Sequence, residues 1–342
     1  MEKIELGQTG MIVNKIGFGA LPLQRSDEKD AVRFLKKAYN NGINFFDTAR
    51  AYTNSEERIG KALSDVRENI YIASKTKSTT PEEVWKDLET SLKNLKTDYI
   101  DLYQFHNPPF CPKPNDEHGI YDVFLEAKEE GLIKHIGITS HKHSLANKEI
   151  KSGLFETMQY PFSYLSDEKD FRILDLCMEN NMGFIAMKAL SGGLIKNSKA
   201  AYAFIEEYPE VVPIWGIQKE SELDEFLKWG EINPRMDDEI KEVIRKDKEE
   251  LQGDFCRGCA YCQPCREDIQ ISMCARMSLW IRRFPTEPYL TKEYQEMMSK
   301  IEDCKECGDC IKRCPYELNI PELLKENYRD YQNVLSGETK IN

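Results

Sequence analysis

The chain has 342 residues, of which 40% are hydrophobic and 31% are charged, and its formal net charge is −12. This composition is typical of a soluble globular protein with room for a large and a small domain, and no apolar run approaches the ~18 residues of a membrane span. The acidic balance argues against a nucleic-acid partner, because a phosphate backbone would be repelled.

Short β-prone runs alternate with charged helical segments over the first 235 residues. The runs are KIGFGA (15–20), NFFDTA (44–49), IYIASK (70–75), LYQF (102–105), HIGITS (135–140), TMQYPF (157–162), GFIAMKA (183–189) and VPIWGI (212–217). Seven helical segments separate them and an eighth is expected at 220–230, which predicts a (β/α)₈ TIM barrel. A doubly wound open sheet is the alternative, but GFGALPL does not match the glycine-rich turn that usually follows its first strand.

The residue composition of the chain changes after the predicted barrel. Residues 236–252 read as a solvated helix, because Glu and Lys recur at supporting spacings. Short loops, cysteines and helical segments follow. We therefore expect a barrel at 1–235, a helical connector at 236–252 and a small, mostly helical ferredoxin-like domain at 253–342. The first ten residues lack an apolar stretch, so we expect no secretory signal and a cytoplasmic location.

Polar residues stand at the ends of three successive predicted strands. Asp47 ends the second strand, Lys75 the third and His106 the fourth, while Tyr52 follows Asp47 in the loop. Strand ends meet at the C-terminal rim of such a barrel, where catalysis takes place. Each residue alone has an ordinary structural interpretation, such as a helix cap or packing. Together they predict a shared pocket.

This set of residues suits the reduction of a carbonyl group. Hydride addition leaves an alkoxide that must be protonated, and Tyr52 is a plausible acid if its pKa is lowered. The charge of Lys75 would lower that pKa, and Asp47 would hold the ammonium group in place. His106 could donate a hydrogen bond to the carbonyl oxygen as charge develops there.

Several stretches closely resemble the aldo-keto reductase superfamily, across roughly residues 5–230. They are GINFFDTARAYTNSEERIGKAL, ASKT, DYIDLYQFHNP and GLIKHIGITSH. The resemblance implies a (β/α)₈ barrel that reduces a small-molecule carbonyl substrate, or oxidises an alcohol, with a nicotinamide cofactor. It also implies a catalytic tetrad of Asp47, Tyr52, Lys75 and His106.

The resemblance also implies residues that bind the nicotinamide cofactor. Thr139, Ser140 and Gln159 stand where the family holds the carboxamide, and Met187 stands where an aromatic residue usually stacks on the ring. Methionine can still pack on the ring, without the aromatic face.

The loop after the eighth strand corresponds to the part of the family that binds the adenosine end. It supplies Gly216, Lys219 and Ser221, while Glu222 stands where the family often has an arginine for the 2′-phosphate. An acid repels a phosphate but can accept from a ribose hydroxyl. A Glu222 that faces solvent is the alternative, so the sequence leaves NAD and NADP both open.

Nine of the 11 cysteines fall between positions 256 and 314. The first cysteine run is Cys256, Cys259, Cys262 and Cys265, and the second cysteine run is Cys304, Cys307, Cys310 and Cys314. The second run is C-x₂-C-x₂-C-x₃-C-P, the bacterial ferredoxin spacing for [4Fe–4S] clusters, in which the fourth cysteine serves the other cluster. This logic predicts one cluster on Cys256, Cys259, Cys262 and Cys314, and a second on Cys304, Cys307, Cys310 and Cys265.

Zinc is the alternative metal, but a zinc site prefers two C-x₂-C pairs to triplets that continue into a fourth cysteine. The first run departs from the ferredoxin pattern, since two residues precede Cys265 and Arg266 replaces the expected proline. A single cluster therefore stays an alternative. We expect Cys274, outside both runs, to be a packed thiol. Both runs after such a barrel resemble a branch of aldo-keto reductases with a C-terminal ferredoxin-like domain.

The two halves imply different electron chemistry. A nicotinamide passes two electrons as hydride, a [4Fe–4S] cluster moves one, and the sequence shows no flavin signature. We expect an oxidoreductase of the aldo-keto reductase type that carries two clusters. The alternative is an iron–sulfur electron-transfer or redox-sensing protein that uses the barrel to bind a ligand, with a ferredoxin or a flavoprotein as redox partner.

Overall fold

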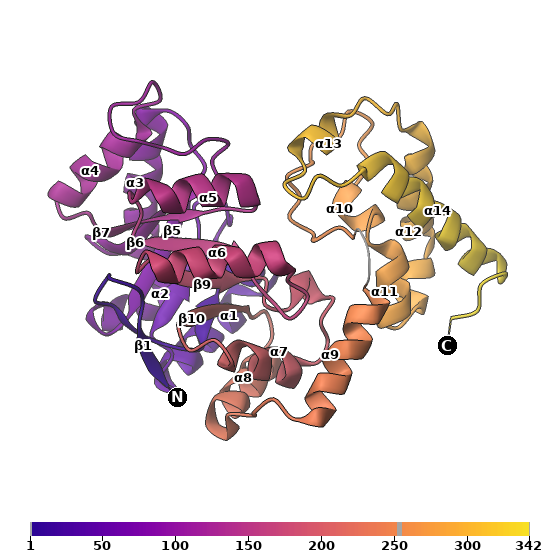
Figure 1. Cartoon of the computed structure of the whole chain (residues 1–342), viewed down its shortest axis with the longest axis horizontal. Coiled ribbons are helices and arrows are strands. Elements are labelled where there is room, and N and C mark those ends of the chain that lie inside the picture. The colour runs from indigo at the N-terminus through magenta and orange to yellow at the C-terminus, as the bar shows by residue number, and fades with distance from the viewer. Residues whose placement is uncertain (1, 252–254, 342) are drawn as a thin grey trace. The chain divides into compact units, whose positions relative to one another are not determined.

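The computed structural model describes residues 2–251 and 255–341 (Figure 1). The chain folds into two compact units. The first unit contains the chain up to Leu190 together with Asn197–Ile244, and the second contains Ser191–Lys196 together with the chain from Arg245 onward. The expected end of the connector at 252 and the expected start of the last domain at 253 lie outside the described residues.

Eight parallel strands of the first unit close into a barrel in chain order. They are β3 (Gly17–Gly19), β4 (Phe45–Asp47), β5 (Tyr71–Thr76), β6 (Ile100–His106), β7 (Ile133–Thr139), β8 (Thr157–Pro161), β9 (Gly183–Met187) and β10 (Val211–Gly216). The ring closes because β10 pairs with β3. All eight predicted strands and the barrel are thus confirmed, and the open sheet is excluded. An antiparallel hairpin, β1 (Lys3–Glu5) and β2 (Ile12–Asn14), precedes the barrel.

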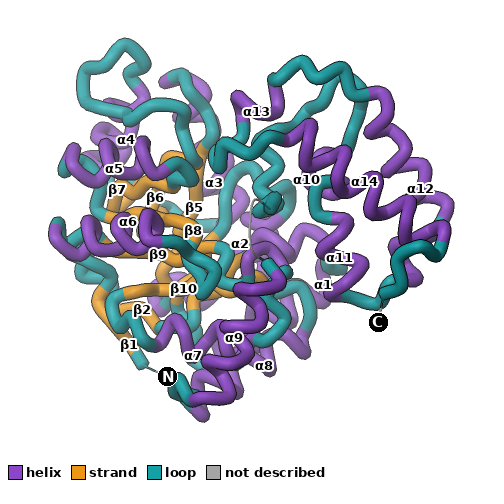
Figure 2. The backbone as a smooth tube through the Cα atoms, turned by 45° about the vertical axis from the view of Figure 1, so that its right-hand side comes forward, coloured by secondary structure: helices purple, strands orange, loops and turns teal. Residues whose placement is uncertain are grey.

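Helices surround the ring of strands (Figure 2). They are α1 (Glu28–Asn40), α2 (Ser55–Leu63), α3 (Pro81–Leu95), α4 (Ile120–Glu129), α5 (His143–Ser152), α6 (Glu168–Glu179), α7 (Ser198–Glu206) and α8 (Glu220–Ile232). Each follows one barrel strand and most bury one stripe; α1, for example, buries Ala31, Phe34, Leu35 and Ala38, the i, i+3, i+4 and i+7 positions of one face. Short 3₁₀ helices, η1 (Leu21–Arg25), η2 (Ser64–Asn69) and η3 (Ser191–Gly193), lie in the connections.

The strand register aligns the predicted site residues along one rim. Lys75 pairs with Gln104 across β5 and β6. His106 pairs with Thr139, and Thr139 pairs with Gln159. Because neighbouring strands of a parallel barrel present their carboxyl ends at the same edge, these side chains belong to one surface.

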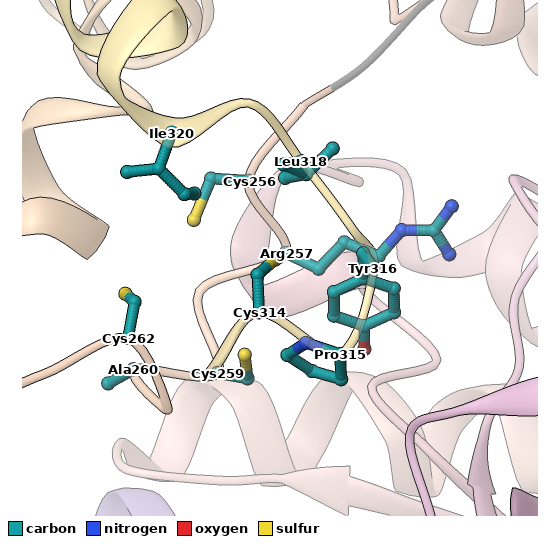
Figure 3. Close-up of a pocket in the computed structure, with 10 residues that line it drawn as sticks. All are labelled: Cys256, Arg257, Cys259, Ala260, Cys262, Cys314, Pro315, Tyr316, Leu318 and Ile320. Carbon is teal, nitrogen blue, oxygen red and sulfur yellow. The ribbon is translucent and has the colours of Figure 1, made fainter. Parts of the chain in front are cut away.

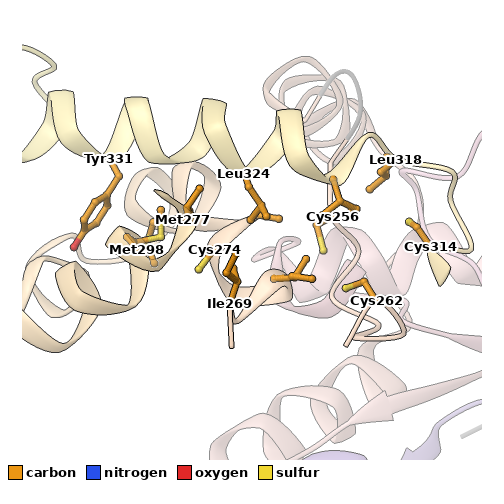
Figure 4. Packing of buried hydrophobic residues seen from close by; sticks show 14 of the residues in the cluster. Cys256, Cys262, Ile269, Cys274, Met277, Met298, Cys314, Leu318, Leu324 and Tyr331 are labelled. Atoms are coloured by element: carbon orange, nitrogen blue, oxygen red, sulfur yellow. The ribbon is translucent and has the colours of Figure 1, made fainter. Parts of the chain in front are cut away.

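The described part of the second unit consists of helices and loops. After α9 (Asp238–Glu250), which crosses the division between the units, come α10 (Ile271–Cys274), α11 (Met277–Arg283), η4 (Glu287–Leu290), α12 (Lys292–Ser299), η5 (Lys300–Asp303), α13 (Asp309–Arg313) and α14 (Ile320–Ser336). Leu324 and Tyr331 of α14 pack with Met277 and Met298 in one apolar cluster (Figure 4). No helix within residues 2–251 and 255–341 has the length and apolarity needed to cross a bilayer.

Candidate active site and candidate metal centres

A buried ion pair lies at the rim where β4 and β5 end. Nζ of Lys75 donates to Oδ2 of Asp47 at 2.6 Å and to the carbonyl oxygen of Thr48 at 2.7 Å. The side chain of Lys75 is fully buried and that of Asp47 is 3% exposed. Burial lowers the pKa of Lys75 and raises the pKa of Asp47, while the attraction between the two opposes both shifts. The pKa of Lys75 therefore depends on nearby charges more strongly than the pKa of a surface lysine does.

The loop between β4 and α2 folds Tyr52 back over this pair. Nζ of Lys75 lies 5.4 Å from the centroid of the Tyr52 ring. The Tyr52 ring meets the His106 ring edge-on, with 5.6 Å between centroids and 85° between planes. The backbone N–H of Arg50 donates to the carbonyl oxygen of Lys75 at 2.9 Å, which ties the loop to β5. The structure thus brings Asp47, Tyr52, Lys75 and His106 together.

His106 is held as a neutral imidazole. Burial lowers its pKa well below the ordinary value, and the charges of Lys75 and Lys77 lower it further. Among the described residues, Nδ1 of His106 is buried without a hydrogen-bond partner. A neutral ring can donate one N–H toward a substrate oxygen without bringing a second positive charge beside Lys75.

Two buried glutamines support Asp47 from neighbouring strands. Nε2 of Gln104 donates to Oε1 of Gln159 at 3.0 Å. Hydrogen bonds from Gln159 and Gln104 lower the pKa of Asp47 and so favour its carboxylate form. Sequence reasoning missed Gln104, although an amide within the buried run LYQF was a usable signal.

A second acidic residue anchors the loop from the side of α2. Glu56 is 1% exposed and accepts hydrogen bonds from the hydroxyls of Ser74 and Ser91, both at 2.6 Å. It also forms an ion pair with Arg50. Its charge raises the pKa of Lys75. Glu56 is a supporting residue that the sequence analysis did not identify.

The residues expected near the nicotinamide lie along β7, β8 and β9. The hydroxyl of Thr139 is buried without a partner among the described residues, as a site for a ligand amide requires. The backbone N–H of Ser140 donates to the carbonyl oxygen of Gln159 at 3.1 Å. Met187 is half-buried at the end of β9 and packs against the barrel core. These donors and acceptors fit a carboxamide group.

The loop between β10 and α8 holds the residues expected near the adenosine end. Gly216 is exposed and pairs with Gly19 of β3, and Lys219 and Ser221 are also exposed. Oε2 of Glu222 accepts from the backbone N–H groups of Gln218 at 2.8 Å and Lys219 at 3.1 Å. Glu222 therefore caps the first turn of α8, which neither sequence interpretation of this residue had anticipated.

The profile of the aldo/keto reductase family matches residues 15–203, more than half of the chain. The chain belongs to the aldo/keto reductase family. Proteins of this family are oxidoreductases that act on carbonyl and alcohol groups with nicotinamide cofactors. The match ends before the cysteine runs, so family membership rests on the barrel.

Individual relatives agree with this membership. The uncharacterized oxidoreductase YqkF of Bacillus subtilis is 30% identical over 209 residues, which cover 57% of this chain and 67% of that protein. The aldo-keto reductase YhdN of the same organism is 28% identical over 215 residues, covering 57% and 64%. This chain thus spans about two thirds of the length of both relatives. The holo form of an aldo-keto reductase from Bacillus halodurans shares the fold, with a TM-score of 0.64, 22% identity and coverage of 72% of this chain and 96% of that one.

Beyond the family match, four cysteines of this aldo/keto reductase line one hollow, here called the first centre. Cys256, Cys259 and Cys262 come from the first run and Cys314 from the end of the second (Figure 3). Their sulfur atoms face a shared space, which is completed by Arg257, Ala260, Pro315, Tyr316, Leu318 and Ile320. Three of the four are buried, and the N–H of Gly258 lies 3.4 Å from Sγ of Cys256. Four thiols around one hollow suit a [4Fe–4S] cluster better than a tetrahedral zinc ion, because no group of three or more cysteines among the described residues has its sulfur atoms all within 4.8 Å of one another.

The remaining cysteines of the two runs, Cys265, Cys304, Cys307 and Cys310, are the expected ligands of a second cluster and are here called the second centre. Cys265, Cys304 and Cys310 are half-buried and pack against the apolar cluster of this unit, while Cys307 is exposed. Arg313 of α13 donates to the carbonyl oxygens of Gln263 at 3.0 Å and Pro264 at 2.9 Å. Arg266 forms an ion pair with Asp309 at 2.9 Å. These contacts hold the end of the first run against the second.

Two further groups of possible metal ligands have structural roles. Cys274 is fully buried, and its Sγ lies 3.8 Å from the carbonyl oxygen of Met297, as expected for a packed thiol. His143, Asp167 and Asp170 place three possible ligand atoms within 4.8 Å of one another. The two aspartates form the capping box of α6, and His143 lies 2.8 Å from Asp170. Helix capping accounts for this group.

Proposed function

We propose that this aldo/keto reductase reduces a carbonyl group of a small molecule, or oxidises the corresponding alcohol, at the rim formed by β4, β5 and β6. The observation that carries the proposal is the buried ammonium group of Lys75, 2.6 Å from Asp47 and 5.4 Å from the Tyr52 ring centroid. A cation held in that place stabilises a tyrosinate and so lowers the cost of proton transfer from the hydroxyl.

Each of the four residues has one role in this proposal. A bound nicotinamide would supply the hydride. Tyr52 would give its hydroxyl proton to the oxygen of the substrate, with Lys75 stabilising the remaining charge. Asp47 would keep Lys75 in place and charged. His106, neutral and adjacent to Tyr52, would donate a hydrogen bond to the same oxygen and orient it.

NAD and NADP are both compatible with the proposed site. The buried hydroxyl of Thr139, with Ser140 and Gln159, would hold the carboxamide, and Met187 would pack on the ring. Gly216, Lys219 and Ser221 would meet the adenosine end. Because Glu222 is engaged by the backbone of α8, its charge is partly compensated there. Its effect on a 2′-phosphate is then weaker than that of a free carboxylate.

We further propose two [4Fe–4S] clusters, one at the first centre and one at the second. The shared hollow of Cys256, Cys259, Cys262 and Cys314 supports this assignment, because it joins three cysteines of one run with the last cysteine of the other. Such a cluster would supply or accept one electron at a time. The second would be held by Cys265, Cys304, Cys307 and Cys310.

Anaerobic turnover tests the reductase proposal. The purified protein would be mixed with NADH or NADPH and a panel of aldehydes and ketones, and cofactor oxidation would be compared with alcohol formed. We expect a one-to-one ratio, and we expect Tyr52→Phe to abolish it while nicotinamide binding persists. Tyr39→Phe, at a half-buried tyrosine on α1, is the matched control. Turnover by the Tyr52→Phe variant equal to that of the wild type would refute the proposal.

The second candidate is an electron-transfer or redox-sensing protein in which the barrel only binds a ligand. The exposed Cys307 favours it, because a ligand thiol at the surface brings a cluster within reach of a partner such as a ferredoxin or flavoprotein. The discriminating measurement is reversible reduction of the clusters by dithionite and reoxidation by such a carrier. Electron transfer that is unaffected by Tyr52→Phe, with no carbonyl turnover, would select this candidate.

A further inference from the structure

Arg276 is a buried cation beside the first centre. It lies between α10 and α11 and is 7% exposed. Its Nη2 donates to the carbonyl oxygen of Gly192 at 2.7 Å, and its guanidinium carbon lies 4.8 Å from the Trp280 ring centroid. Burial lowers the pKa of Arg276, and attraction to Cys256 raises it. The side chain is therefore fixed on two sides and close to a predicted cluster ligand.

One N–H of this side chain, that of Nε, has no partner among the described residues. The Nε atom is also buried. An unsatisfied buried donor costs about 1–3 kcal/mol, and more when it is charged. This N–H is therefore available to an acceptor that the described polypeptide does not supply.

The cysteine loop is shaped to admit the guanidinium group. A Cβ at Gly258 would lie 2.4 Å from Nη1 of Arg276, and the φ of Gly258 is +64°. Only glycine satisfies both conditions without rearrangement. The N–H of this glycine lies 3.4 Å from Sγ of Cys256. Arg276 thus packs directly on the turn that joins Cys256 to Cys259.

We propose that Arg276 is a positioning residue for the first centre, where its Nε–H donates a hydrogen bond to a sulfur of the bound cluster. Its positive charge then raises the reduction potential of that cluster, because reduction adds a negative charge that the guanidinium group stabilises. The inference rests on the proposed cluster and adds the residue that tunes it. The reaction concerned is the gain of one electron by an oxidised cluster.

Redox titration of the whole protein, followed by electron paramagnetic resonance, tests this inference. The protein would be purified without oxygen and titrated with dithionite, and Cys307→Ser would identify the signal of the second centre. We expect Arg276→Met to make reduction at the first centre at least about tenfold less favourable, a downward shift of about 59 mV for one electron. Arg276→Lys keeps the charge and should recover most of the shift. Arg266→Met, at the exposed pair with Asp309, is the control and should leave the first centre unchanged.

Unchanged potentials in an Arg276→Met protein with full iron content would overturn the inference. If that variant fails to bind a cluster at the first centre, a measurement on the wild-type protein tests the inference. Protein labelled with ¹⁵N-arginine should show a nitrogen coupling to the reduced first cluster in pulsed resonance spectra, and absence of that coupling would overturn the inference. A wild-type protein without acid-labile sulfide would instead refute the proposed clusters themselves, so the two failures are distinguishable.

Discussion

Nζ of Lys75 lies 2.6 Å from Oδ2 of Asp47, in a place where neither side chain reaches solvent. A charge so deeply buried is tolerated only with a partner, because the desolvation cost of each ion is several kcal/mol. The pair therefore constrains the fold as well as the proposed chemistry. Any change to one member acts on the other.

Asp47→Asn should destabilise the protein by about 3–5 kcal/mol, because the ammonium group of Lys75 loses its counter-charge. The double variant Asp47→Asn/Lys75→Met should be more stable than Asp47→Asn, since no unpaired charge remains. Urea unfolding under anaerobic conditions measures both values. Additive losses in the double variant would show that the two side chains are not energetically coupled.

His106→Gln should lower kcat/KM by about 10²–10³-fold, through loss of a hydrogen-bond donor at the reacting oxygen. Because the pKa of His106 lies well below its ordinary value, the wild-type profile of kcat/KM should show no imidazole inflection near pH 6.5. Below that pH the unfolded chain binds a proton that the folded chain does not, so His106 destabilises the fold in acid. An inflection near pH 6.5 that disappears in His106→Gln would contradict this assignment.

Glu149 of α5 should make the protein less stable as the pH rises. It is fully buried, neither of its carboxyl oxygens has a hydrogen-bond partner among the described residues, and burial raises its pKa to about 8. Between the ordinary carboxyl pKa and about 8, the folded state binds one more proton than the unfolded state. Its contribution to stability is therefore complete in acid and is lost as the pH approaches 8.

Replacement of Glu149 by Gln imitates the protonated carboxyl group and removes this pH dependence. We expect Glu149→Gln to match the wild type near pH 4.5 and to exceed its free energy of unfolding at pH 8, by on the order of a few kcal/mol. Thermal melts at both pH values measure the difference. The exposed Glu130→Gln on the turn after α4 is the control and should change neither melt. A gain that is equal at both pH values would point to packing in place of titration.

The origin of the fourth ligand can be tested by single cysteine replacements. Cys314→Ser should lose or perturb the cluster of the first run, and Cys265→Ser that of the second, each reducing iron from about eight to about four atoms per chain. Cys274→Ser, at the packed thiol outside both runs, should keep both clusters. Iron and sulfide analysis with absorption spectra gives the counts. The assignment would be wrong if Cys314→Ser affected the same cluster as Cys307→Ser.

Much of the barrel could be predicted from the sequence, because buried parallel strands are short apolar runs and each is followed by an amphipathic segment. Asp47, Lys75 and His106 could be identified for the same reason: each interrupts the apolar pattern where its run ends. Their convergence follows from topology alone.

Residues that act through long-range burial could not be predicted in the same way. Glu56 resembles any acid in the first turn of a helix, and only the approach of Ser74 and Ser91 reveals it as an anchor. Glu222 could not be recognised as a capping residue either, because the residue before α8 is Lys219, whereas Ser, Thr or Asp normally marks such a helix start. Arg276 depends on a glycine 18 positions earlier.

The position of the segment Ser191–Lys196 affects the order in which contacts form during synthesis. It follows β9 and precedes α7, yet it belongs to the second compact unit. Its carbonyl groups at Gly192 and Leu194 accept from Arg276 and Arg283, which lie more than 80 positions later. During synthesis this stretch emerges long before its donors exist. The hydrogen bonds of this segment can therefore form only after Arg276 and Arg283 have been synthesised, so the second compact unit is completed late in translation.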